Sequence, residues 1–161
     1  MRQGFAIAFF ISMVTTSAIA QQVLTLDMRP DENCHFQPEK EESCVKFFGC
    51  FVQDGVWFSG TSRGWNAGQI DLTASDGETC TGVFSYRSVL DMGKAELNCS
   101  SRDTTELTFF NRGDDLNVVT GTGVSADGQR VQMWAGERVA DYIAQTVDGP
   151  LTCGDLVIEL R

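Results

Sequence analysis

Positive charge is scarce in this chain. It has 12 Lys and Arg residues against 22 Asp and Glu residues, a formal net charge of −10. Nucleic acids and anionic lipid surfaces attract proteins through Lys and Arg, so this balance argues against both as partners. It favours a partner with a basic surface, because opposite charges steer association. The apolar fraction of 42% can still form a core, so we expect one folded domain.

Histidine, which commonly carries catalysis or binds metal, is also scarce. His35 is the only histidine, so any Ser–His–Asp or Cys–His site would have to use it. The sequence has no His-x-x-x-His or Cys-x-x-Cys spacing and no glycine-rich phosphate loop, which argues against zinc, thioredoxin-like and nucleotide sites. We therefore predict no metal and no cofactor.

Carboxylates are the remaining candidates for chemistry, because two of them across a cleft can hydrolyse a glycoside. With 22 acidic residues, some pair must lie close by chance. A carboxylate-based glycan hydrolase is therefore an alternative function, and the sequence leaves open whether the protein is an enzyme. The available aspartates are Asp71, Asp91, Asp114, Asp115 and Asp141.

The N-terminus has the pattern of a secretory signal peptide. Met1 and Arg2 precede an apolar run over residues 4–14, and Ala18-Ile19-Ala20 is a small-x-small pattern that signal peptidase accepts. The run is much shorter than the ~20 residues of a membrane-spanning helix, so we favour cleavage over an uncleaved anchor. We predict a periplasmic or secreted protein with no membrane span after cleavage.

All six cysteines lie beyond the predicted cleavage point. An even number of cysteines in an oxidising compartment indicates disulfides. The number of cysteines alone does not choose among the pairings, but a bridge to Cys153 would tie the two ends of the chain together. The cysteines are Cys34, Cys44, Cys50, Cys80, Cys99 and Cys153.

Asp-Gly pairs recur along the chain at a spacing of roughly 21–26 residues, if a degenerate copy near Arg102-Asp103 is counted. This spacing suggests stacked small units. Between extended segments this pair is typical of a β-hairpin, because Gly takes a positive φ without steric cost. A further Asp-Gly pair lies at 148–149. The turns that we predict are Asp54-Gly55, Asp76-Gly77 and Asp127-Gly128.

The hydrophobic pattern selects the register of these hairpins. A two-residue turn at Asp76-Gly77 would divide the apolar residues between both faces, whereas a three-residue loop pairs Leu72 with Cys80 and gathers them on one face. That face contains Ile70, Leu72, Ala74, Cys80, Phe84 and Tyr86. The same loop at Asp127-Gly128 brings together Val119, Val131, Met133 and Ala135.

The next strand pairing predicts one disulfide. Folding 78–86 back on 94–100 with Cys80 opposite Cys99 places Phe84 opposite Ala95, so one face stays apolar. A Cys80–Cys99 bridge would contribute about 3 kcal/mol by closing its loop. The pairing of Cys34, Cys44, Cys50 and Cys153 is left open.

Three tryptophans are candidate binding residues: Trp57, Trp65 and Trp134. Trp134 falls on the face opposite Val131 and Met133, and Trp57 alternates away from Phe58. A Trp on the outside of a sheet is a candidate anchor for a protein or a sugar. The alternative is that it packs against a second sheet or the N-terminal segment.

The segment Asp54–Gly60, Asp-Gly-Val-Trp-Phe-Ser-Gly, resembles the MORN repeat, a β-hairpin unit of similar period. Asp76–Gly82 is similar, with Cys80 in place of the aromatic residue. The resemblance covers about 50–136. It implies a meander of hairpins with a binding or scaffolding role, and it implies no catalytic residues.

We therefore predict a mainly β protein, an antiparallel meander of hairpins that is MORN-like or a small sandwich or barrel, stapled by disulfides. Its expected parts are a signal peptide over 1–20, an N-terminal strand and acidic loop over 21–49, and a hairpin repeat domain over 50–161. The predicted function is non-catalytic: an exported module that binds a protein or an envelope component, one version being an inhibitor of a basic hydrolase. A structural envelope protein is a further alternative.

Overall fold

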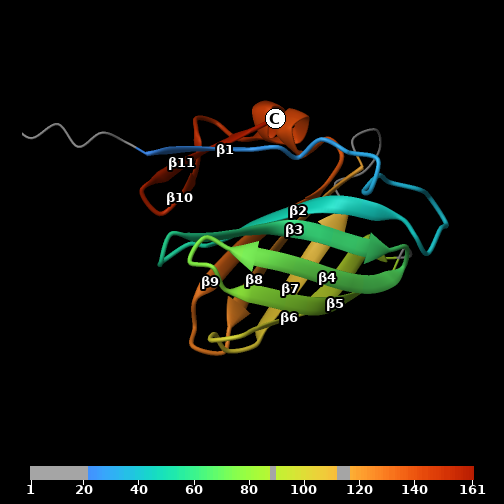
Figure 1. Cartoon of the computed structure of the whole chain (residues 1–161), viewed down its shortest axis with the longest axis horizontal. Coiled ribbons are helices and arrows are strands. Elements are labelled where there is room, and N and C mark those ends of the chain that lie inside the picture. The colour runs from blue at the N-terminus through green and yellow to red at the C-terminus, as the bar shows by residue number, and fades with distance from the viewer. Residues whose placement is uncertain (1–21, 88–89, 112–116) are drawn as a thin grey trace, which may run out of the picture.

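The computed structural model describes residues 22–87, 90–111 and 117–161 (Figure 1). The predicted signal peptide lies outside the described residues, as do Asp114 and Asp115.

Within the described residues, eight antiparallel strands close into a barrel (Figure 1). Each strand pairs with the next along the chain, and β9 pairs with β2 to complete the circle. The strands are β2 Cys44–Phe51, β3 Val56–Gly64, β4 Ala67–Ala74, β5 Thr79–Arg87, β6 Met92–Cys99, β7 Thr105–Asn111, β8 Val118–Ser125 and β9 Arg130–Gly136.

The barrel is the correct alternative for the fold, and the MORN-like repeat meander is wrong. An open meander would leave the edges of β2 and β9 unpaired, and closure removes both edges. In the closing pair Phe47 lies opposite Ala135 and Gly49 opposite Met133. These residues join one apolar interior with residues from the other strands, so the apolar face of every hairpin is buried against the others.

The predicted hairpin registers are confirmed. Leu72 pairs with Cys80, and Gly77 has a φ of 87°, as the three-residue loop requires. Val119 pairs with Ala135 across the hairpin at Asp127-Gly128. Because connections in an up-and-down barrel alternate between its two ends, the three predicted Asp-Gly turns all lie at the same end.

The six cysteines lie in the described residues and form three disulfides, Cys34–Cys44, Cys50–Cys153 and Cys80–Cys99. The last is the pairing that the register predicted, since Cys80 lies directly opposite Cys99. The bridge to Cys153 ties the late part of the chain to the barrel.

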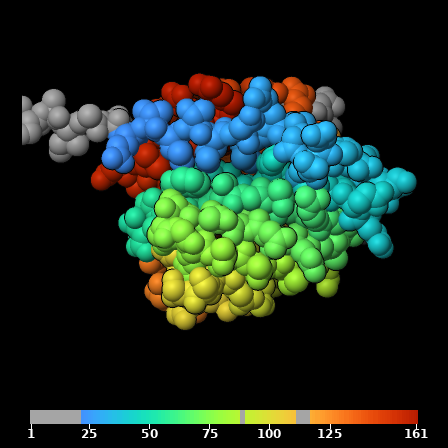
Figure 2. Space-filling model, in the orientation of Figure 1, coloured from blue at the N-terminus to red at the C-terminus, as the bar shows by residue number. Residues whose placement is uncertain are grey.

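A second unit packs on the outside of the barrel. In the described part of the chain it comprises strands β1 Val23–Leu26, β10 Leu151–Cys153 and β11 Leu156–Leu160, with helix α1 Val139–Thr146. β1 runs parallel to β11, so the first and last strands of the described chain lie side by side above the barrel (Figure 2). The barrel itself spans 44–136, whereas the sequence predicted a repeat domain over 50–161. Helix α1 was not among the elements that the sequence predicted.

A second apolar core joins this unit to the outer face of β2, β8 and β9. Phe48 and Val118 are fully buried there, and Ile158 and Val139 contribute from the added unit. Side chains alternate between the two faces of a strand, so β2 supplies Phe47 to the barrel interior and Phe48 to this outer core.

Removing the Cys50–Cys153 bridge by a Cys50→Ala, Cys153→Ala double substitution should cost more stability than removing Cys80–Cys99 in the same way. The two bridges join residues 103 and 19 positions apart. Chain entropy then gives losses of about 4.7 and about 3 kcal/mol in the free energy of unfolding. Urea unfolding of both variants measures the difference, and an equal or reversed order would contradict the expectation.

Candidate functional site

The barrel end with the Asp-Gly turns is closed by a charged network. The Glu78 side chain is only 4% exposed and pairs with Arg102, which also pairs with Asp76 at 2.7 Å. The backbone N–H and hydroxyl of Ser101 donate hydrogen bonds to the same Glu78 carboxylate. The Arg102 guanidinium lies 5.1 Å from the centre of the Phe51 ring, so it covers the interior at this end.

This network changes the pKa of both carboxylates in the same direction. The Arg102 hydrogen bond lowers the pKa of Asp76 from its ordinary value. Burial alone raises the pKa of Glu78, but the hydrogen bonds from Ser101 and the charge of Arg102 outweigh it and lower that pKa. Both groups therefore stabilise the fold in their ionised form.

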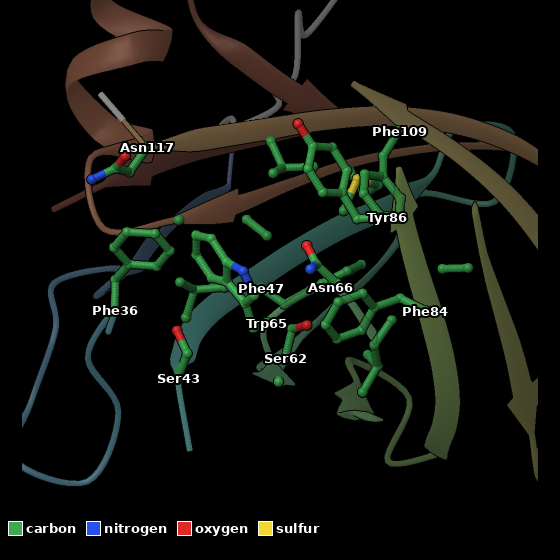
Figure 3. Close-up of a pocket in the computed structure, with 18 residues that line it drawn as sticks. Phe36, Ser43, Phe47, Ser62, Trp65, Asn66, Phe84, Tyr86, Phe109 and Asn117 are labelled. Carbon is green, nitrogen blue, oxygen red and sulfur yellow. The ribbon is translucent and has the colours of Figure 1, made fainter. Parts of the chain in front are cut away.

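The opposite end of the barrel opens into a cavity of about 150 Å³ (Figure 3). Its walls come from the barrel strands, the β3–β4 connection and the loop that precedes β2. The lining residues are Phe36, Ser43, Val45, Phe47, Ser62, Gly64, Trp65, Asn66, Ile70, Phe84, Tyr86, Ala95, Phe109, Asn117, Val119, Met133, Ala135 and Gly136.

Glycine and alanine at inward positions explain why space remains here. A Cβ on Gly93 would lie 2.1 Å from the Phe109 ring, so that ring can lie across the barrel wall only because Gly93 has no side chain. The Tyr86 ring stacks on Phe109 with centroids 6.3 Å apart. With small Ala95 and Ala135 on the facing walls, the rings leave the centre of the barrel open at this end.

Two aromatic rings mark the rim of the cavity. Phe36 and Trp65 have ring centroids 5.6 Å apart, and Trp65 is 36% exposed. Phe36 lies in the loop that the Cys34–Cys44 disulfide closes, and its backbone N–H donates a hydrogen bond of 2.7 Å to the Glu137 carboxylate. This side of the rim is therefore fixed at two points.

The lining contains polar groups but, among the described residues, no charged side chain. The Ser43 hydroxyl accepts a hydrogen bond from the Gln37 N–H, and the Tyr86 hydroxyl donates to Asp91 at 2.9 Å. The Ser62 hydroxyl has no hydrogen-bond partner within the described residues. A site of this composition suits an uncharged, mostly apolar ligand.

The tryptophans predicted as binding residues separate in the structure. Trp65 lies at the rim of the cavity. Trp134 is 9% exposed and stacks on Phe48, with centroids 5.8 Å apart, in the outer core. Trp57 lies partly buried against the same core. For Trp134 the packing alternative is therefore correct, because the added unit covers the outer face of β9.

The candidate acids that lie in the described residues, Asp71, Asp91 and Asp141, do not meet in this cavity. Asp71 is exposed on β4, and Asp141 lies on α1, where it pairs with Arg138. Asp91 contacts the site only through the Tyr86 hydroxyl. His35 is exposed in the rim loop. Among the described residues there is no group of three or more His, Cys, Asp or Glu side chains placed to hold a metal ion.

Sequence reasoning missed most of the site, above all Phe36, Phe47 and Phe109. A partial signal was present on β2, where Phe47, Gly49 and Phe51 occupy alternate positions that point inward. Such a strand could be assigned a face, but only closure of the barrel shows that its rings share one space with those of other strands.

No protein-family model and no curated protein matches this chain. Among solved structures, it is similar to a de novo designed fluorescence-activating β-barrel, with 22% sequence identity and a TM-score of 0.45. The similarity covers 58% of this chain and 89% of the designed one. In the part of the chain that is described, no helix has the length and apolar character needed to cross a membrane.

A Glu78→Gln substitution should reduce the loss of unfolding free energy that occurs as the pH falls below about 5. The folded pKa of Glu78 and Asp76 lies below the ordinary values of 4.5 and 3.8, so their stabilisation is present above those values and is lost as the pH falls through the folded ones. We expect the variant to be less stable than the wild type at neutral pH and to lose less between about pH 5 and pH 2. Urea unfolding across that range measures it.

Asp71→Asn is the matched control, because it removes an exposed carboxylate outside the network. A parallel pH dependence for Glu78→Gln and the wild type would show that the network does not stabilise the closed end.

Proposed function

We propose that this protein is a non-catalytic binding protein that holds a small, largely apolar molecule in the open end of its barrel. The observation that carries the proposal is the cavity of about 150 Å³, whose described lining is apolar and aromatic with a few polar groups and no charge. Ligand sites in proteins have this composition, and eight-stranded barrels have interiors wide enough for one small ligand.

The surroundings of the cavity favour binding without rearrangement. The wall is a closed sheet, the far end is sealed by Arg102 and Glu78, and Cys34–Cys44 fixes the rim loop. A site that is already formed has little ordering cost when the ligand enters. The gain comes from apolar ligand surface removed from water, about 25 cal/mol per Å².

The functions predicted from the sequence differ in how well they are supported. Binding of a basic protein or envelope component, including inhibition of a basic hydrolase, remains a prediction based on the net charge of −10. A glycan hydrolase would need two carboxylates facing one cleft, and the described lining of the cavity includes none. Three disulfides are consistent with an oxidising, exported environment, and export itself remains a prediction.

The proposal predicts that an Ala95→Leu substitution, which fills the cavity, weakens binding of small apolar probes at least tenfold. The measurement is an amide NMR titration with toluene, p-cresol and 1-octanol, chosen to differ in shape and polarity. We expect saturable shifts at Trp65 and along the lining strands for at least one probe in the wild type. Extra methyl groups in a packed interior cost about 1–3 kcal/mol, so the same spectra first establish that the variant is folded.

Ala67→Leu provides the matched control, since it makes the same change at an exposed position outside the lining. It should leave probe affinity unchanged. No saturable shift with any of the three probes, or equal losses in both variants, would overturn the proposed function.

A further inference from the structure

We infer that the ligand is an uncharged molecule with a single aromatic ring and one hydroxyl group, such as a phenol, which enters ring first and bonds to Ser62. This inference rests on the proposed function and adds the chemical class of the ligand. Four properties of the cavity carry it: its charge, its volume, the nature of its walls and the place of its free hydroxyl.

The absence of charge from the described lining excludes an ionised ligand group. Two carboxylates near the rim already have partners in the described residues, because Glu137 accepts the Phe36 N–H and Asp91 accepts the Tyr86 hydroxyl. A carboxylate or ammonium inside the barrel would lose its hydration and gain no counter-charge. The net charge of −10 further disfavours an anion. The ligand group that enters is therefore neutral.

The volume sets the size of that group. An apolar cavity of about 150 Å³ is known to accommodate benzene, and this cavity has about the same volume. One ring therefore fits between the walls. A second fused ring would have to remain at the mouth beside Phe36 and Trp65, where it keeps contact with water.

The walls favour a flat aromatic group over an alkyl chain. Figure 3 shows Phe47, Phe84, Tyr86 and Phe109 around one space, each from a barrel strand. Phe84 meets Phe109 edge to face at 6.4 Å, so both edges and faces of rings border the cavity. An aromatic ligand gains such contacts in addition to its buried area, and the Met133 sulfur offers a further favourable contact with a ring.

The Ser62 hydroxyl supplies the polar contact. Ser62 belongs to β3, where it pairs with Val45 and Ile70, and all three line the cavity. The other polar side chain on the strand walls, Tyr86, donates its hydroxyl to Asp91. Ser62 can both donate and accept, so a ligand hydroxyl is a suitable partner.

The test compares p-cresol with toluene, which has the same ring and methyl group and no hydroxyl. We expect p-cresol to bind the wild-type protein about threefold to tenfold more tightly, the range of one neutral hydrogen bond. Ser62→Ala should remove that preference and leave toluene affinity unchanged. Ser85→Ala, on the exposed face of β5, should leave both affinities unchanged. Amide NMR titration at neutral pH gives all these affinities.

Charged and larger probes test the other properties. Benzoate and benzylammonium should bind at least tenfold more weakly than p-cresol, because neither charge finds a partner. 2-Naphthol should bind no more tightly than p-cresol, because its second ring stays outside the cavity. Tight binding of benzoate, benzylammonium or 2-naphthol would overturn the inferred class, as would a p-cresol preference that persists in Ser62→Ala.

The two proposals fail in different ways. If 1-octanol gives saturable shifts at the lining and neither p-cresol nor toluene does, the protein binds apolar ligands and the aromatic class is wrong. If no neutral probe binds at all, the proposed function fails together with this inference.

Discussion

The pairing of β9 with β2 is the contact on which the rest of the structure depends. It joins residues from the two ends of the barrel segment, with Phe47 opposite Ala135 and Phe51 opposite Val131. Without it the sheet has two open edges and no interior. With it, one face of every strand becomes the inside of a barrel. The same pair also forms the platform, with Phe48 and Trp134, on which the added unit packs.

Closure gives the barrel two unlike ends. The tight Asp-Gly turns, the Cys80–Cys99 bridge and the network of Asp76, Glu78 and Arg102 gather at one end. The other end carries flat rings and small residues on its walls, with Phe36 and Trp65 at the rim. The chain is strongly acidic, but no charged side chain is among the described residues that line the cavity. The described lining is therefore neutral.

The local structure was accessible from the sequence, and the closure was not. The register at Asp76-Gly77 and the Cys80–Cys99 pairing follow from alternation over a few residues, since a slip by one position would expose an apolar face. The β2–β9 pairing and the Cys50–Cys153 bridge join positions far apart, which no local pattern specifies. Trp134 shows the same limit: alternation placed it outside the barrel, but the added unit that covers it comes from distant segments. The cavity likewise depends on rings from separate hairpins meeting after closure.

The position of the three indoles has a practical consequence. Trp57 and Trp134 pack in the outer core, whereas Trp65 lies beside Phe36 at the mouth, partly open to water. Indole fluorescence depends on the polarity around the ring, so filling the mouth alters the emission of one tryptophan and leaves the surroundings of the other two intact. For the binding function proposed above, Trp65 is therefore a built-in optical reporter of occupancy, and no label has to be attached near the opening.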